Sequence, residues 1–236
     1  MPLPTIESPK YVLTIPSTKQ SVEYRPFLVK EEKILLLAQE SNESTEMMSA
    51  IKDIIFACTF ETVDPKELTS FDLEYVFLKL RAKSVGEISN IKVKCSHCET
   101  YNEVSINLDD IQLTWPEKEV SSKIMLTDKV GVILQHIKVG NMPALSDSDK
   151  ISGETITNMI IASIESIFDD NGVYQSNQSS KEELITFVNS LNRTQINKIE
   201  EYISNTPKLE HVAIFECDGC KKENNIALSG IQAFFE

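Results

Sequence analysis

Two short cysteine pairs, far apart along the chain, constrain the fold more than any other feature of the sequence. They are Val93-Lys94-Cys95-Ser96-His97-Cys98 and Phe215-Glu216-Cys217-Asp218-Gly219-Cys220. The segments that follow them match at equal offsets: Asn102 with Asn224, Val104 with Ile226, and Ile106 with Leu228. The shared pattern predicts a strand, a tight Cys-x-x-Cys turn and a second strand. This is the pattern of a zinc knuckle, and two facing knuckles form a zinc ribbon.

Four thiolates suit a closed tetrahedral Zn²⁺ site, because this borderline-soft metal binds sulfur well. The predicted ligands of one structural zinc ion are Cys95, Cys98, Cys217 and Cys220. The separation is unusual: the two halves of a zinc site are commonly about 15–20 residues apart, whereas residues 99–216 lie between these pairs. A shared metal would therefore pin together the two ends of a long insertion.

Two other interpretations of the cysteines stay open, namely two independent thiol pairs without metal and a thioredoxin-like redox pair. The redox interpretation requires one Cys-x-x-Cys at a strand-to-helix junction, whereas polar, strand-like segments follow both pairs here.

The fifth cysteine, Cys58, lies in an apolar helical run and is expected to be a packed core residue. Free thiols suit a reducing compartment. The start of the chain has no secretory signal pattern, so we expect a cytoplasmic protein.

The net charge of −13 argues against nucleic acid as the main partner, because a phosphate-binding surface requires positive charge. Lys221-Lys222 is the only basic candidate near a knuckle. A nucleic-acid-binding zinc ribbon is nevertheless the first functional alternative, and a thiol–disulfide oxidoreductase is the second. No stretch approaches the roughly 20 apolar residues of a membrane span, so none is expected.

The pattern of hydrophobic residues predicts an α+β fold, in which a zinc-ribbon-like pair of Cys-x-x-Cys β-hairpins joins a mostly helical bundle and an N-terminal β-hairpin. Residues 1–87 should form the hairpin (11–15 with 22–25) and helices, the last of which begins after Asp64-Pro65. Residues 88–108 and 207–236 should form a discontinuous zinc-ribbon-like module. Residues 109–206 should form an αβ insertion that is helical in its second half.

Within this insertion, apolar spacing predicts a helix over 155–168. Ser180 and Glu183 form a capping-box pattern that predicts a short helix, and Thr194 opens another that ends before Pro207. Near the end of the chain, Phe234-Phe235 should dock on the core or on a partner, because two exposed phenylalanine side chains are costly in water.

We find no phosphate-binding glycine-rich loop, no Gly-x-Ser-x-Gly elbow and no His-Glu-x-x-His motif, so we expect a protein that is not an enzyme. The histidines are expected to be structural or, for His97, a solvated turn residue. Asp109-Asp110 and Asp169-Asp170 are expected to be solvated turns, because no partner group accompanies them in the sequence. The segment Lys30-Glu31-Glu32-Lys33 is either a partner-binding face or a solvated helix start.

Several segments in a fixed order resemble the T4-type bacteriophage baseplate hub family, which comprises hub subunits and hub assembly proteins. They are both knuckles, Tyr24-Arg25-Pro26-Phe27-Leu28-Val29-Lys30-Glu31-Glu32-Lys33, Phe71 to Glu87, and Gly230-Ile231-Gln232-Ala233-Phe234-Phe235. The resemblance implies a non-enzymatic role in building the hub of a contractile tail, with other hub proteins as partners. It implies a location in the host cytoplasm or the virion, and it supplies no catalytic residue.

Overall fold

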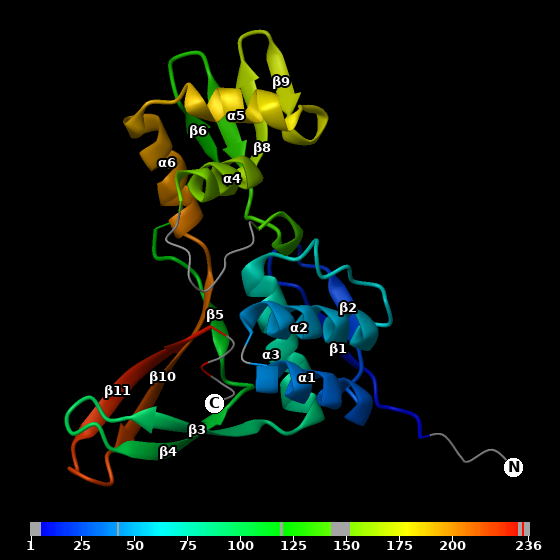
Figure 1. Ribbon diagram of the computed structural model, residues 1–236, viewed down its shortest axis with the longest axis vertical. Coiled ribbons are helices and arrows are strands. Elements are labelled where there is room, and N and C mark those ends of the chain that lie inside the picture. The colour runs from blue at the N-terminus through cyan, green and yellow to red at the C-terminus, as the bar shows by residue number, and fades with distance from the viewer. Residues whose placement is uncertain (1–5, 42, 119, 143–151, 231–232, 234–236) are drawn as a thin grey trace, which may run out of the picture. The chain divides into compact units, whose positions relative to one another are not determined.

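The computed structural model describes residues 6–41, 43–118, 120–142, 152–230 and 233, and it has the mixed α+β architecture that the sequence predicts. The chain divides into two compact units, and each unit combines segments that are remote in sequence (Figure 1). Unit 1 comprises residues 1–65, 71–114 and 208–236. Unit 2 comprises residues 66–70 and 115–207.

Unit 1 begins with a β-hairpin followed by three helices. These elements are β1 (Tyr11–Thr14), β2 (Ser21–Tyr24), α1 (Val29–Ser41), α2 (Ser44–Cys58) and α3 (Ser70–Ser84). The predicted hairpin is confirmed, with Tyr11 opposite Tyr24. The turn between β1 and β2 is hydrogen-bonded to α3: the Ser17 N–H donates to the buried Asp72 carboxylate at 2.9 Å. The last of these helices begins later than predicted, at Ser70.

Helix α3 is the central helix of unit 1, and its predicted apolar stripe is buried. The residues of that stripe are Leu73, Val76, Phe77 and Leu80, and Phe71 and Leu78 are buried as well. Helix α2 buries one face and ends at Cys58, which is fully buried as expected. Burial raises the pKa of this thiol to about 11, so it stays protonated and behaves as a core residue. Helix α1 differs, since only Glu31 and Ala38 are buried in it.

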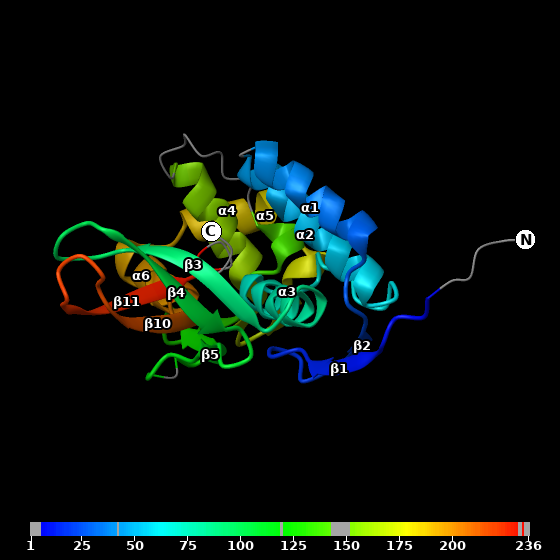
Figure 2. The same ribbon diagram turned by 90° about the horizontal axis from the view of Figure 1, so that it is seen from below.

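The second half of unit 1 consists of two long hairpins and one short strand. These are β3 (Ile88–Lys94) with β4 (Tyr101–Asn107), β10 (Lys208–Glu216) with β11 (Glu223–Ser229), and β5 (Gln112–Thr114), which pairs with β10. The two hairpins lie side by side in both views of the molecule (Figure 1, Figure 2). Period-two alternation directs Ile91, Val93 and Ile106 into a common core with Ala213 and Leu228. One apolar core therefore holds both hairpins together.

Unit 2 is a four-stranded antiparallel sheet, with strands in the order β6-β7-β8-β9, packed with three helices. Its elements are β6 (Lys123–Met125), β7 (Gly131–Leu134), η1 (Val139–Asn141), α4 (Gly153–Ser163), β8 (Ile164–Asp169), β9 (Gly172–Gln175), η2 (Ser176–Gln178), α5 (Lys181–Asn189) and α6 (Arg193–Ser204). Val132 and Leu134 from the sheet share a core with Ile160, Val188 and Ile199 from the helices.

The predicted helix over 155–168 is wrong beyond Ser163, where the chain becomes strand β8. The apolar residues of this stretch fit a helical period, but β8 pairs with β7 on one side and β9 on the other. This pairing buries Ile164 and Ser166 and exposes Glu165, which is the period of a strand. Pairing with two neighbours therefore overrides the local helical pattern.

The capping box of Ser180 and Glu183 is confirmed at the start of α5. Helix α6 has a second capping box, formed by Asn192 and Gln195. The predicted docking of Phe234-Phe235 concerns residues outside the described part of the chain. Within that part, no helix is both long enough and apolar enough to cross a membrane.

Candidate metal centre

The two Cys-x-x-Cys turns have matching backbone geometry. In each turn, the N–H of the first cysteine donates to a carbonyl beyond the pair at 2.9 Å, from Cys95 to Thr100 and from Cys217 to Lys222. The carbonyl of the first cysteine accepts from the residue after the second cysteine, which is Glu99 or Lys221. Both of these residues have a positive φ, 62° and 58°. The predicted internal repeat is therefore a repeat of three-dimensional structure.

The packing of the hairpins brings all four predicted ligand sulfur atoms together, within 4.8 Å of one another. Sulfur to sulfur, Cys98 lies 3.5 Å from Cys217, and Cys95 lies 3.8 Å from Cys220. A regular tetrahedron with metal–sulfur distances of about 2.3 Å has edges of about 3.8 Å. The cluster therefore has the size and the donor set to hold one metal ion.

The environment of the cluster favours the thiolate form of some of its cysteines. Burial raises the pKa of the Cys95 thiol, but hydrogen bonds from the backbone amides of His97 and Cys98 outweigh it and lower this pKa to about 6. Hydrogen bonds from Thr100 lower the pKa of Cys98. The Lys222 amide lowers the pKa of Cys220, but burial and the other three sulfur atoms together raise it to about 11. Thiolates are the metal-binding form, and a cation would relieve their mutual repulsion.

Asn102 and Asn224 cross-link the two knuckles reciprocally. The Asn224 Oδ1 accepts from the Ser96 N–H at 3.0 Å, and the Asn102 Oδ1 accepts from the Asp218 N–H at 2.8 Å. Each asparagine also donates through Nδ2 to a backbone carbonyl in its own knuckle. Both are buried, so each amide fixes the turn of the opposite hairpin. The sequence signal for this role is their equal offset after the first cysteine of each pair, which by itself indicates a repeat but not a contact between its two copies.

The knuckles also approach closely at Gly219. A Cβ atom added there would lie 2.8 Å from the Thr100 Oγ1 of the other knuckle, which is too close without a shift. In addition, the Asn102 Nδ2 lies 3.6 Å from the Cys217 Sγ and donates a hydrogen bond to it. The close approach at Gly219 and the hydrogen bond from Asn102 to Cys217 both join one knuckle to the other next to the sulfur atoms.

Other residues that the sequence singled out do not join this site. His97 is exposed in its turn, as expected, and the ring of His136 stacks on Tyr202 at 5.6 Å in unit 2. His211 is half-buried on β10. The Asp169 carboxylate accepts from the backbone of Asn171 inside its own turn.

The expectation that no partner accompanies Asp109 is wrong. Its carboxylate lies 3.1 Å from the Lys83 Nζ and 3.6 Å from the Lys79 Nζ. These lysines lie four residues apart on α3, so they share a face of that helix but are remote from Asp109 in sequence. The helix start predicted at Lys30-Glu31-Glu32-Lys33 is confirmed, since α1 begins at Val29, but Glu31 is buried against Arg25 and not solvated. The alternative, a partner-binding face, stays a prediction.

The fold and the cysteine cluster define an α+β protein with a zinc-ribbon-like arrangement. The family model described as T4 bacteriophage base plate protein matches residues 8–236, so the chain belongs to that family. Neither a curated protein nor a solved structure matches the chain in the two other comparisons. Family membership assigns the protein to the phage base plate in the virion tail, with other base plate proteins as its partners.

Proposed function

We propose that the protein is a non-enzymatic, protein-binding component in the structure or assembly of the base plate hub, stabilised by one structural zinc ion. The observation that carries the zinc proposal is the convergence of four sulfur atoms from two remote hairpins to within 4.8 Å. The family match over residues 8–236 supports the base plate role.

A structural role suits the proposed zinc better than a catalytic one. Four cysteine ligands complete a tetrahedral site, so no position is left for water or substrate. Metal binding to such sites contributes on the order of 10 kcal/mol in model peptides, which is comparable with the stability of a whole domain. The zinc would therefore hold together the ends of the segment between the knuckles.

The metal is tested by elemental analysis of protein purified without chelator, with one zinc ion per chain expected. Cys98→Ser should lose the metal and destabilise unit 1, because one ligand is missing. Cys58→Ala is the matched control, since this thiol is buried in the helical core and should leave the metal content unchanged. Metal-free protein from several preparations, or equal metal content in Cys98→Ser, would overturn the zinc proposal.

The hub role is tested by co-purification with the other hub proteins, followed by mass spectrometry of finished particles. Recovery of the chain in particles is expected for a hub subunit, and its presence only in assembly intermediates is expected for an assembly factor. Failure to associate with any hub protein in either setting would refute a hub-specific role.

The two alternative functions make distinct predictions. A nucleic-acid-binding ribbon should retain DNA on a filter at low salt, whereas the net charge of −13 favours negligible retention. The surface of the knuckles has mixed charge, since Lys94 pairs with Glu99 and Lys221 lies near Asp218. A thiol–disulfide oxidoreductase should reduce insulin, which the proposed metal-bound thiolates would not do.

A further inference from the structure

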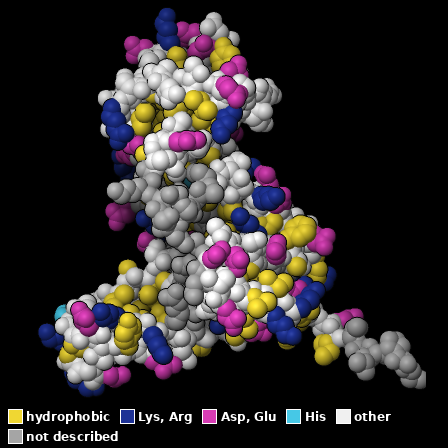
Figure 3. All heavy atoms as spheres, viewed as in Figure 1, with side chains coloured by type: hydrophobic (Ala, Val, Ile, Leu, Met, Phe, Trp, Pro, Cys, Tyr) yellow, Lys and Arg dark blue, Asp and Glu magenta, His cyan; other side chains and the backbone are white. Residues whose placement is uncertain are grey.

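Helix α1 exposes several large apolar side chains on its outer face. Its inward side holds Glu31 and Ala38, whereas Val29, Leu36 and Leu37 are 65%, 52% and 66% exposed. On the face shown in Figure 3, hydrophobic side chains gather over α1 and α2 among charged ones. Apolar side chains grouped in this way commonly mark an interaction surface.

Two charged residues of opposite sign lie on the same face of α1. Lys33 and Glu40 are both exposed, and their spacing of seven residues is about two helical turns. We refer to these two residues, together with Val29, Leu36 and Leu37, as the α1 surface. Among the described residues, neither Lys33 nor Glu40 takes part in an ion pair within the chain.

The charges on the α1 surface are arranged so that two antiparallel copies of the helix would place opposite charges next to each other. Lys33 comes three residues before Leu36, and Glu40 comes three residues after Leu37. In an antiparallel pair of α1 helices, a two-fold axis between Leu36 and Leu37 brings Lys33 of each copy level with Glu40 of the other. The same operation brings Leu36 of each copy level with Leu37 of the other.

We propose that the α1 surface is a homodimer interface, in which two copies of the chain pair through antiparallel α1 helices. Such a contact is isologous, because each residue pair occurs twice across the two-fold axis. The leucine side chains leave water at the centre, and two equivalent Lys33–Glu40 pairs fix the register and the direction of the helices. This proposal does not depend on the zinc ion or on the hub assignment.

The size of the surface sets the strength of the dimer. Helix α1 has 13 residues, so it is about 20 Å long. One face of such a helix is smaller than the roughly 800 Å² per partner of a standard stable interface. We therefore expect a reversible dimer that dissociates on dilution.

Sedimentation equilibrium of the full-length chain, over about a hundredfold range of concentration, measures this association. The monomer has a mass of 26.6 kDa, and wild-type protein should approach twice that mass as concentration rises. Lys33→Glu and Glu40→Lys should each weaken dimerisation about tenfold or more, because each places two like-charge pairs in the interface. Lys92→Glu and Glu117→Lys, exposed sites outside α1, are charge-matched controls that should leave the equilibrium unchanged.

Exchanging the charges at positions 33 and 40 distinguishes a paired interface from a general effect of charge on association. The double variant Lys33→Glu/Glu40→Lys restores both pairs and should dimerise as the wild type does. An equimolar mixture of the two single variants should form a heterodimer about as tightly as the wild type dimerises, although each variant associates with itself much more weakly.

Wild-type protein that stays monomeric over the whole range would overturn the proposal and leave the α1 surface to a different partner. Single variants that behave like the controls, or a double variant that stays monomeric with an unchanged circular dichroism spectrum, would also overturn it.

Discussion

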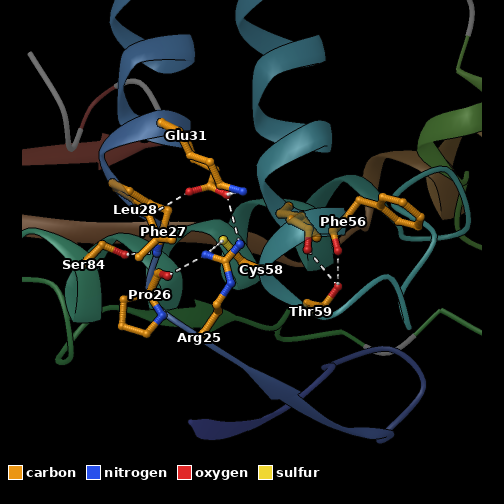
Figure 4. Close-up of polar contacts among 11 residues, drawn as sticks. Arg25, Pro26, Phe27, Leu28, Glu31, Phe56, Cys58, Thr59 and Ser84 are labelled. Atoms are coloured by element: carbon orange, nitrogen blue, oxygen red, sulfur yellow. Dashed lines mark hydrogen bonds and ion pairs between the residues drawn. The ribbon is translucent and has the colours of Figure 1, made fainter. Parts of the chain in front are cut away.

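The ion pair between Arg25 and Glu31 is a buried link that should dominate the stability of the helical part of unit 1. Arg25 follows β2, and its Nη2 donates to the Glu31 carboxylate at 2.9 Å (Figure 4). The Arg25 Nη1 donates to the Pro26 carbonyl at 3.0 Å and lies 3.7 Å from the Cys58 Sγ. The Leu28 N–H donates to the other carboxylate oxygen of Glu31 at 2.8 Å, which caps the start of α1. One side-chain pair thus joins β2, α1 and α2.

The expected magnitude follows from the burial of both partners. The side chains of Arg25 and Glu31 are only 14% and 5% exposed. At 2.9 Å, with an effective dielectric constant near 20, two unit charges attract by roughly 6 kcal/mol before the cost of desolvation. Removal of one partner from a buried pair costs about 3–5 kcal/mol, because the other charge stays buried without compensation. We therefore expect Glu31→Ala to lower the free energy of unfolding by about 3–5 kcal/mol.

A double replacement should cost much less than either single one. Arg25→Met with Glu31→Leu removes both charges and leaves apolar side chains of similar length, which is often close to neutral. Glu23→Gln is the matched control, because its pair with Lys10 at 3.5 Å is about 60% exposed on both sides. An exposed pair of this kind contributes about 0–1 kcal/mol.

Acid should weaken the effect of Glu31→Ala. Burial raises the pKa of Glu31, but hydrogen bonds from Arg25 and Leu28 outweigh it and hold this pKa below its usual range. A depressed folded-state pKa contributes stability that is present above the unfolded value of about 4.3 and is lost as the pH falls through the folded value. The difference between wild type and Glu31→Ala should therefore shrink below about pH 4.

Native-state hydrogen exchange with mass spectrometry is the suitable assay, because it measures each unit of the chain separately. Peptides from α1 and α2 should exchange faster in Glu31→Ala, whereas peptides from α5 and α6 in unit 2 serve as an internal control. A single variant as stable as Glu23→Gln, or a double variant as unstable as the sum of its singles, would refute the reasoning.

Three further predictions follow from other contacts. Burial raises the pKa of Glu74 to about 7, so the free energy of unfolding of the wild type should fall as the pH rises from about 4.3 to 7. At pH 8, urea unfolding should show Glu74→Gln to be more stable than the wild type by on the order of 2 kcal/mol. Asn102→Ala and Asn224→Ala should each lower metal affinity by about 10–100-fold in competition with a chelator, whereas equal affinity would show that the cross-links do not position the ligands. Gly131→Ala should destabilise unit 2 by about 1–3 kcal/mol, since its Cβ would overlap the Phe168 ring, and an added Phe168→Leu should recover part of the loss.

Local patterns predicted the elements that local chemistry specifies. The Cys-x-x-Cys turns, the buried Cys58 and the capping box of Ser180 and Glu183 all follow from residues close together in sequence. The helix predicted over 155–168 failed because its second half pairs with strands on both sides, which local periodicity does not reveal. The pairing of Asp109 with Lys83 was not predicted for a similar reason, since these residues are 26 positions apart in sequence. The contact of Glu31 with Arg25 spans six residues, but its burial depends on the packing of β2, α1 and α2.

The sequence by itself determined that the chain has two equivalent knuckles, which thiols belong to them, and that the composition is acidic. These properties depend only on residue types and short spacings. The tertiary structure decided that the four sulfur atoms meet, that Asn102 and Asn224 each hydrogen-bond to the turn of the opposite knuckle, and that Leu36 and Leu37 of α1 are exposed. The meeting of the sulfur atoms and of the asparagines depends on the apolar core that the two hairpins share, because packing sets which remote side chains become neighbours.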